Sequence, residues 1–203
     1  MDIYRIPRVV HSLYRDFVWE LPEKEKTIYL TFDDGPTEMA TSWILKTLGE
    51  FGAKATFFCV GNNVKKLPHL HEEILEQGHA VGNHTFSHVK NRKLSPEAYL
   101  EEVVLTSDYI DSKNFRPPYG RISQAQAKLV QDAGYRIIMY SLLTNDFNPD
   151  LDSGVILDRS IKLTKKGSLV VFHDSKKAFG HLQFVLRPYL GFLKSEGYKF
   201  KVL

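Results

Sequence analysis

The feature that most constrains the fold of this chain is the alternation of short apolar runs with longer amphipathic segments. About seven runs rich in β-branched and aromatic residues, typical of buried strands, are separated by segments with the apolar spacing of helices. Such alternation indicates parallel strands joined by helical crossovers, in either a barrel or a doubly wound sheet. With 203 residues and no internal repeat or low-complexity linker, the sequence predicts a single domain.

The expected elements follow from periodicity and from turn residues. We expect a helix or an extended arm over residues 6–19. The expected strands are 27–32, 55–60, 80–82, a short strand at 115–120 that two prolines interrupt, 135–142, 169–172 and 198–203. The expected helices are 39–51, 62–77, 95–111, 123–133, 152–165 and 181–195.

The first expected strand ends in two adjacent carboxylates. Asp33 and Asp34 follow the alternating run 27–32, and Gly35 and Pro36 then stop the strand in a tight turn. Neighbouring carboxylates both stay ionised only when positive charge lies beside them, which favours a bound cation. An ordinary polar turn is the alternative interpretation, because Asp, Gly and Pro are the usual turn residues.

A pair of histidines supplies further metal ligands. His84 and His88 follow the third expected strand, and on a helical turn this spacing places both imidazoles on one side. Two histidines and a carboxylate form a familiar catalytic zinc shell that leaves a position open for water or substrate. We therefore predict that Asp34, His84 and His88 bind a divalent metal, zinc in the first place and cobalt or nickel as alternatives. Asp33 is then left as a base for water whose pKa zinc lowers to about 7.

Other chemically active side chains also follow expected strands. In βα barrels the functional groups lie where strands end, and Arg116, Asp146 and His173 occupy such positions. Arg116, held by its proline neighbours, is suited to fork the Asp33 carboxylate with two hydrogen bonds, although a surface ion pair is the alternative. The main-chain N–H of Tyr119 could stabilise an oxyanion, and His173 could protonate a leaving amine.

Composition argues against several other classes of protein. The net charge is +3, with basic and acidic residues interspersed, so we expect no nucleic-acid partner. Cys59, the single cysteine, lies in an apolar run and is expected in the core. No apolar run approaches the ~20 residues that cross a bilayer, and residues 1–26, a predicted N-terminal arm or short helix, lack the pattern of an export signal. We expect a cytoplasmic protein, with association with the cell envelope as the alternative, and the sequence does not predict its oligomeric state.

Four motifs together resemble those of the polysaccharide deacetylases, the NodB-homology enzymes of carbohydrate esterase family 4. They are TFDDGP at 31–36, HTFSH at 84–88, RPPYG at 116–120 and LVVFH at 169–173. The resemblance runs from residue 27 to residue 203 and implies a single-domain distorted (β/α)7 barrel with parallel strands. It also implies metal-dependent removal of N-acetyl groups, and sometimes O-acetyl groups, from carbohydrate polymers or oligomers such as chitin oligomers or peptidoglycan.

The resemblance assigns a role to each candidate residue. The implied catalytic residues are Asp33 as base, Arg116 as the partner of that base, Tyr119 as oxyanion donor and His173 as acid. The implied metal ligands are Asp34, His84 and His88. The implied substrate contacts are Pro117, Asp146, Phe147 and Leu169.

One motif departs from the family pattern. Leu143 and Phe147 stand where the family usually has an Asp and a Trp, although Asp146 is kept. The missing Asp normally tunes the acid histidine, so Asp146 or Asp174 would have to act on His173 instead.

Two other functions stay open. A carbohydrate-binding or regulatory module without turnover fits Leu143, whereas a glycosidase fits poorly because its carboxyl groups must lie ~5 Å or more apart across the scissile bond.

Overall fold

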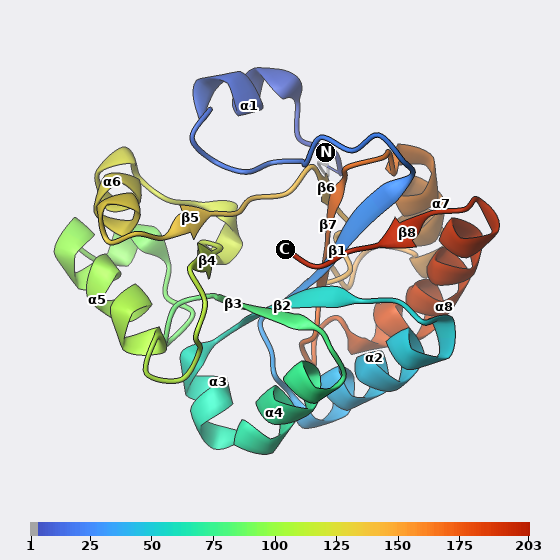
Figure 1. Ribbon diagram of the computed structural model, residues 1–203, viewed down its shortest axis with the longest axis horizontal. Helices are drawn as coiled ribbons and strands as arrows, with labels where there is room; N and C mark the ends of the chain where they lie inside the picture. The colour runs from blue at the N-terminus through green and yellow to red at the C-terminus, as the bar shows by residue number, and fades with distance from the viewer. Residues whose placement is uncertain (1–3) are drawn as a thin grey trace.

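The fold is built around a curled sheet of parallel strands, which the computed structural model describes for residues 4–203 (Figure 1). Within these residues the strand order is β5-β4-β3-β2-β1-β7-β6, and β8 pairs with β1. Every strand pair in this sheet is parallel, so the prediction of a single-domain distorted (β/α)7 barrel is confirmed. The strands are β1 (Thr27–Asp33), β2 (Ala55–Cys59), β3 (Ala80–Asn83), β4 (Asn114–Phe115), β5 (Arg136–Ile137), β6 (Leu142–Leu143), β7 (Leu169–His173) and β8 (Lys199–Phe200).

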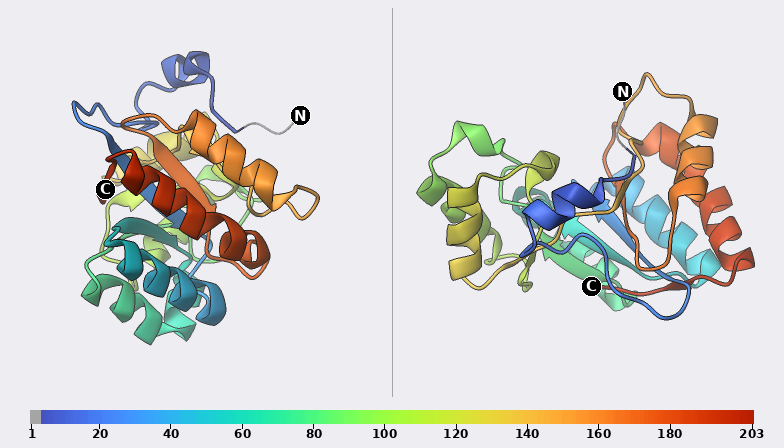
Figure 2. Two further views of the ribbon diagram at one scale, coloured as in Figure 1. Left: turned by 90° about the vertical axis from the view of Figure 1, so that its right-hand side faces the viewer. Right: turned by 90° about the horizontal axis from the view of Figure 1, so that it is seen from above.

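Helices surround the sheet on its outer side (Figures 1 and 2). They include α5, which begins after Ser95 because the Ser95 hydroxyl accepts the Ala98 N–H. None of the helices within residues 4–203 is long and apolar enough to cross a bilayer. The helices are α1 (Arg8–Leu13), α2 (Glu38–Phe51), α3 (Gly61–Lys66), α4 (Pro68–Glu76), α5 (Pro96–Thr106), α6 (Gln124–Asp132), α7 (Ser153–Leu163) and α8 (Phe179–Ser195).

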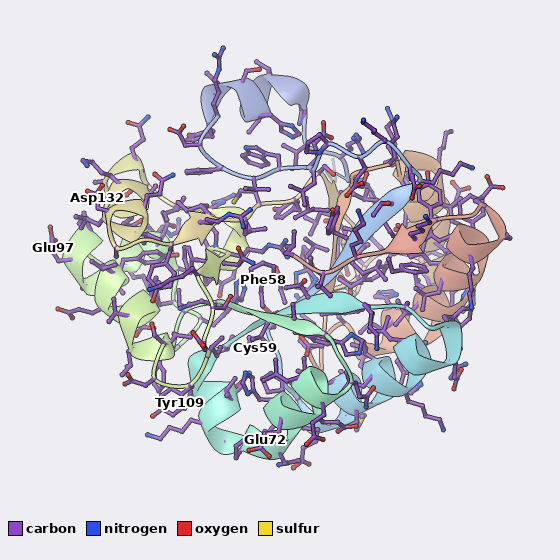
Figure 3. All side chains as sticks on the ribbon, in the orientation of Figure 1. Phe58, Cys59, Glu72, Glu97, Tyr109 and Asp132 are labelled. Carbon is purple, nitrogen blue, oxygen red and sulfur yellow. The ribbon has the colours of Figure 1, made fainter. Side chains whose placement is uncertain are left out.

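Alternate residues of β1 contact opposite sides of the sheet, as strand geometry requires. Ile28, Leu30 and Phe32 pack in the main core with apolar residues of α2 and α8. Tyr29 instead belongs to a small apolar cluster with strand residues of β2 and β7, inside the barrel. Side chains thus fill the barrel interior on one side of the strands and the helix interface on the other (Figure 3).

The N-terminal arm lies across the gap between β5 and β6, which do not pair with each other (Figure 1). Arg5 forms a bridge with Leu142, and Val18 forms a bridge with Ile138. The arm contains both a short helix, α1, and extended segments on either side of it. The arm therefore supplies the backbone hydrogen bonds that the two ends of the curled sheet do not give each other.

Several expected elements differ in extent in the structure. The single helix expected over 62–77 is two helices, α3 and α4, because Pro68 disfavours a helical conformation of Leu67, which has φ −129° and ψ 55°. The single strand expected over 135–142 is also wrong. Its middle pairs with the arm, where Met139 N–H donates to the Val18 carbonyl at 2.7 Å, and the chain forms β5 and β6 as separate short strands. Helix α5 ends at Thr106, five residues before the expected end, and a turn follows.

Candidate active site

Five non-glycine residues among those described have positive φ, and all lie in loops that follow strands. The left-handed region is uncommon for residues with a Cβ and is frequent at functional sites. Asp34, with φ 84°, shows the consequence, because its backbone leaves the strand direction of Asp33 and both carboxylates line one cavity. The five residues are Asp34, Thr85, His88, Tyr119 and Asn145.

The cavity has a volume of about 500 Å³ and lies at the carboxyl ends of the strands. In parallel βα folds this edge is where functional groups gather. The side chains come from the ends of β1, β6 and β7 and from the loops that follow β1, β3, β4, β5, β6 and β7, which lie far apart in the sequence. The predicted site residues that line the cavity are Asp33, Asp34, His84, His88, Tyr119, Phe147 and His173.

The three predicted metal ligands lie side by side. One ligand atom from each of Asp34, His84 and His88 lies within 4.8 Å of the others. Asp34 Oδ1 is 3.0 Å from His88 Nε2 and 3.6 Å from His84 Nε2. The expected helical turn is absent, because residues 84–88 form a bend in which Thr85 and His88 adopt left-handed backbones. The bend, rather than helical spacing, brings the two imidazoles together.

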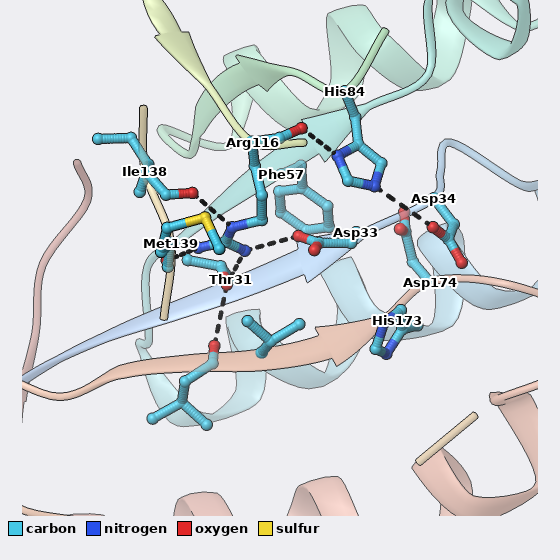
Figure 4. Close-up of polar contacts among 12 residues, drawn as sticks. Thr31, Asp33, Asp34, Phe57, His84, Arg116, Ile138, Met139, His173 and Asp174 are labelled. Carbon is cyan, nitrogen blue, oxygen red and sulfur yellow. Dashed lines mark hydrogen bonds and ion pairs between the residues drawn. The ribbon is translucent and has the colours of Figure 1, made fainter. Parts of the chain in front are cut away.

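The hydrogen bonds around His84 fit a cation at this position. His84 Nδ1 lies 2.7 Å from the Arg116 carbonyl, and a carbonyl can only accept, so Nδ1 carries the proton (Figure 4). A neutral His84 therefore presents the lone pair of Nε2 towards the Asp34 carboxylate, an arrangement that a cation between them makes favourable. Fixing a ligand histidine through its other ring nitrogen is typical of metal sites. The site can thus hold a metal ion.

Asp34 is strongly biased towards its charged form. Burial disfavours the carboxylate, but the contacts with the His84 and His88 rings outweigh it and hold the pKa of Asp34 well below its usual range. The positive charge of His173 acts in the same direction. A permanently charged oxygen ligand is what a divalent cation requires.

Arg116 is completely buried beside Asp33 (Figure 4). Its Nη1 donates to Asp33 Oδ1 at 2.6 Å and to the Thr31 hydroxyl at 2.6 Å, while Nε and Nη2 donate to main-chain carbonyls. The guanidinium also lies 4.0 Å from the Phe58 ring centre. The expected two-pronged contact with the carboxylate is wrong, since Arg116 reaches only one oxygen. Asp33 Oδ2 accepts no hydrogen bond from the described part of the chain.

Asp146 contacts both the ring and the backbone of His173. Its Oδ1 lies 2.7 Å from His173 Nδ1, and its Oδ2 accepts the His173 N–H at 2.9 Å. Burial of the ring opposes protonation, but the Asp146 carboxylate, helped by Asp34 and Asp33, raises the pKa of His173 to about 9. Of the two candidates to replace the acid missing at Leu143, Asp146 is therefore the one in contact.

Asp174 is occupied elsewhere. Its Oδ1 accepts the Gly35 N–H at 2.8 Å and its Oδ2 accepts the Thr41 hydroxyl at 2.6 Å. Burial raises the pKa of Asp174 to about 7, with Asp34 adding to the effect. A Cβ on Gly35 would lie only 1.8 Å from Asp174 Oδ2. Asp174 therefore ties the turn after β1 to α2, and this contact requires glycine at position 35.

The predicted substrate contacts divide into two groups. Phe147 lines the cavity and packs edge-on against His173 at 5.0 Å. Asp146 and Pro117 are buried and are absent from the cavity lining. Leu169 does not fit its predicted role, because it begins β7, four residues before His173, and is fully buried inside the barrel. Leu169, Val171 and His173 alternate onto one face of β7, and of these Val171 and His173 reach the cavity.

Sequence reasoning missed most of the cavity rim. Tyr140 and Ser175 line the cavity, and so do four exposed cationic residues. Their position in loops after strands was the available signal, but each lies among many similar surface residues in the sequence. The four cationic residues are Lys90, Arg92, Arg121 and Lys177.

Comparisons with known proteins agree with this geometry. The family described as polysaccharide deacetylase matches residues 20–138. A peptidoglycan-N-acetylglucosamine deacetylase of Bacillus cereus is 34% identical over 196 residues, covering 90% of this chain and 88% of that protein. A chitooligosaccharide deacetylase of Rhizobium leguminosarum bv. trifolii is 33% identical, with 79% of each chain covered. A crystal structure of a peptidoglycan N-acetylglucosamine deacetylase gives a TM-score of 0.87 at 27% identity, covering 95% of this chain and 94% of that one. This chain belongs to the polysaccharide deacetylase family.

Proposed function

We propose that this protein hydrolyses the N-acetyl group of N-acetylglucosamine residues in a glycan and releases acetate. The observation that carries the proposal is the convergence, in one cavity, of a three-residue metal-ligand cluster with Asp33 on one side and His173 on the other. The names of the relatives from Bacillus cereus and Rhizobium support peptidoglycan or chitin oligomers as the substrate. Peptidoglycan is a polymer of the cell envelope, so a peptidoglycan substrate would place the activity there.

The metal ligands in this proposal are Asp34, His84 and His88. Two imidazoles and one carboxylate suit zinc, and the bound cation supplies Lewis-acid polarisation of water and of the acetamide carbonyl. We assign the main-chain N–H of Tyr119, which lines the cavity beside His88, to the oxyanion.

Asp33 is proposed as the base. Arg116 occupies Asp33 Oδ1 and holds the carboxylate in position. Oδ2 is the oxygen left to accept the proton of the attacking water. Because Arg116 is itself bonded to three further acceptors, the carboxylate cannot turn without breaking a buried network.

His173 is proposed as the acid. Its Nδ1 faces Asp146, so Nε2 is the nitrogen that remains to protonate the leaving amine. A pKa of about 9 keeps the ring protonated at neutral pH, as an acid requires. The contact with Asp146 supports an active enzyme over a binding or regulatory module without turnover, because the departure at Leu143 was the reason to consider that module.

The test is acetate release with and without the base. N-acetylglucosamine oligomers and peptidoglycan are incubated with the wild type, with Asp33→Asn and with the exposed control Asp111→Asn. We expect acetate release that a chelator abolishes and zinc restores. Asp33→Asn is expected to keep its zinc affinity, measured by calorimetry, and to lose about 10²–10⁴-fold in kcat. Full activity of Asp33→Asn, or new reducing ends in place of acetate, contradicts the proposal.

A further inference from the structure

The mouth of the cavity carries an excess of positive charge with no assigned role. Lys90 and Arg92 come from the loop after β3, Arg121 from the loop after β4, and Lys177 from the loop after β7. All four are exposed, and within residues 4–203 none of them forms an ion pair.

The acidic groups of the cavity do not balance this charge. The acidic residues in its lining are Asp33 and Asp34. Asp33 is paired with Arg116, and Asp34 contacts His84 and His88. The four rim cations are therefore exposed to solvent around a concave surface without an acidic partner among its lining residues. Clefts lined by one sign of charge concentrate ligands of the opposite sign.

Two of the cations are arranged in the same way on opposite sides of the site. Lys90 Nζ lies 5.4 Å from the ring centre of Tyr119, and that ring lies 4.8 Å from the metal-ligand candidate His88. Lys177 Nζ lies 5.6 Å from the ring centre of Phe147, which contacts His173 at 5.0 Å. Each side of the site thus has an aromatic wall with a lysine held over it.

We propose that Lys90 and Lys177 select a glycan whose sugars on either side of the reacting N-acetylglucosamine carry anionic substituents. This inference rests on the proposed deacetylase function and names the substrate class of the same site. A neutral oligomer gains nothing from the unpaired cations, whereas an anionic substituent beside each lysine forms a charge-assisted hydrogen bond. Arg92 and Arg121 extend the same field around the mouth of the cavity. A carboxylate and a phosphate satisfy this chemistry equally.

The test compares glycans that differ only in charge. The first is an N-acetylglucosamine oligomer in which alternate sugars carry a carboxyethyl ether, and the second is its methyl ester. An oligomer with a 6-phosphate on the flanking sugars, against its unphosphorylated form, separates phosphate from carboxylate. The readout is the ratio of kcat/KM for the charged form to kcat/KM for the neutral form. We expect a ratio well above one in the wild type for at least one of the two charged substrates.

Lys90→Gln and Lys177→Gln are each expected to lower this ratio about two- to five-fold, the effect of one exposed ion pair, and the double variant by the product. Raising the ionic strength should lower kcat/KM for the charged glycan alone. The matched controls Lys93→Gln and Lys176→Gln, exposed neighbours outside the cavity lining, should keep the wild-type ratio.

Equal turnover of charged and neutral glycans by the wild type overturns the inference. An unchanged ratio in both lysine variants overturns it as well. Acetate release from the neutral ester shows in either case that the deacetylase function itself holds, and absence of acetate from every substrate counts against that function instead.

Discussion

Asp146 is the carboxylate in contact with His173. The position that usually carries the tuning acid is Leu143, which lines the cavity as an apolar residue. Asp146 binds His173 through both carboxylate oxygens, and the Thr144 hydroxyl donates to Asp146 Oδ1 at 3.1 Å. In the proposed mechanism His173 must be protonated, and Asp146 raises the pKa of its ring, so this contact sets the upper pH limit of the reaction.

Replacing Asp146 with Asn should lower the pKa of His173 from about 9. Burial disfavours the charged ring, and in the variant the opposing effect of the Asp146 carboxylate is lost. The alkaline limb of kcat is expected to move to lower pH, since activity is lost as pH rises through this pKa. The kcat–pH profile and the NMR titration of the His173 ring measure the shift. The exposed control Asp150→Asn should leave both unchanged, and an unmoved alkaline limb in Asp146→Asn contradicts the role of Asp146.

His173 also links pH to stability. Its pKa in the folded state lies above the ordinary value of 6.5. Its contribution to the free energy of unfolding is therefore fully present below pH 6.5 and is lost as pH rises through about 9. In Asp146→Asn this alkaline loss should shrink, which denaturant titrations of the metal-free protein between pH 6 and 10 would measure.

Gly35 is a second residue at which one contact matters, because the neighbouring Asp174 leaves no room for a side chain at position 35. Gly35→Ala places a methyl group against Asp174 Oδ2 and should lower the free energy of unfolding by about 1–3 kcal/mol. Since the turn also carries Asp33 and Asp34, acetate release should fall with it. Gly49→Ala in α2 has open space at its Cβ and should be neutral or stabilising by about 0.5–1 kcal/mol. Equal stability of the two variants, measured by denaturant titration, would contradict the steric argument.

At the scale of elements, buried polar contacts join neighbouring strands. His79, just before β3, accepts the Ala55 N–H of β2 on Nδ1 at 3.2 Å and packs edge-on against Phe57. Burial, with a smaller effect of Lys54, lowers the pKa of His79 to about 4. The β2–β3 pair therefore depends on a neutral imidazole.

This dependence predicts acid sensitivity. Between pH 6.5 and about 4 the unfolded chain binds a proton at His79 that the folded chain excludes, so stability falls as pH falls through this window. His79→Gln keeps an acceptor for Ala55 and should flatten the dependence of Tm on pH there. His69→Gln, at an exposed position in α4, should not. An unchanged slope in His79→Gln would contradict the assignment.

At the scale of the whole molecule, the N-terminal arm joins the two ends of the curled sheet. Val18 N–H donates to the Ile137 carbonyl at 2.9 Å, and the Val18 carbonyl accepts the Met139 N–H. Tyr4 and Ile6 make equivalent backbone bonds to Leu143 and Ser141. We propose that residues 4–26 belong to the same folding unit as the barrel.

Val18→Pro tests this arrangement, because proline removes the donor to Ile137 and leaves a buried carbonyl unpaired. We expect a loss of about 1–3 kcal/mol in the free energy of unfolding relative to Val18→Ala, which keeps the backbone bonds. The loss should appear in a single cooperative transition by both far-UV CD and fluorescence. If the arm unfolds separately at lower denaturant, the arm is not part of the same folding unit.

The sequence by itself determined what depends on short stretches of chain. The strand that begins at residue 27, the helices that begin after Ser95 and Asp152, and the charged residues at the ends of strands all follow from local periodicity and turn chemistry. The edge that carries the cavity follows as well, because every strand is parallel. Only the tertiary structure decided how far each residue lies from the cavity. Leu169 is buried inside the barrel, whereas Val171 reaches the cavity.

Contacts between distant segments were also decided only in three dimensions. Asp146 and His173 are 27 residues apart, and Arg5 and Leu142 are much farther apart in the chain. Which acid meets the histidine, which strand the arm joins and which lysines surround the cavity depend on how the sheet curls. The curvature of the sheet cannot be predicted from the local sequence pattern, because the curvature results from the packing of all the helices and strands together.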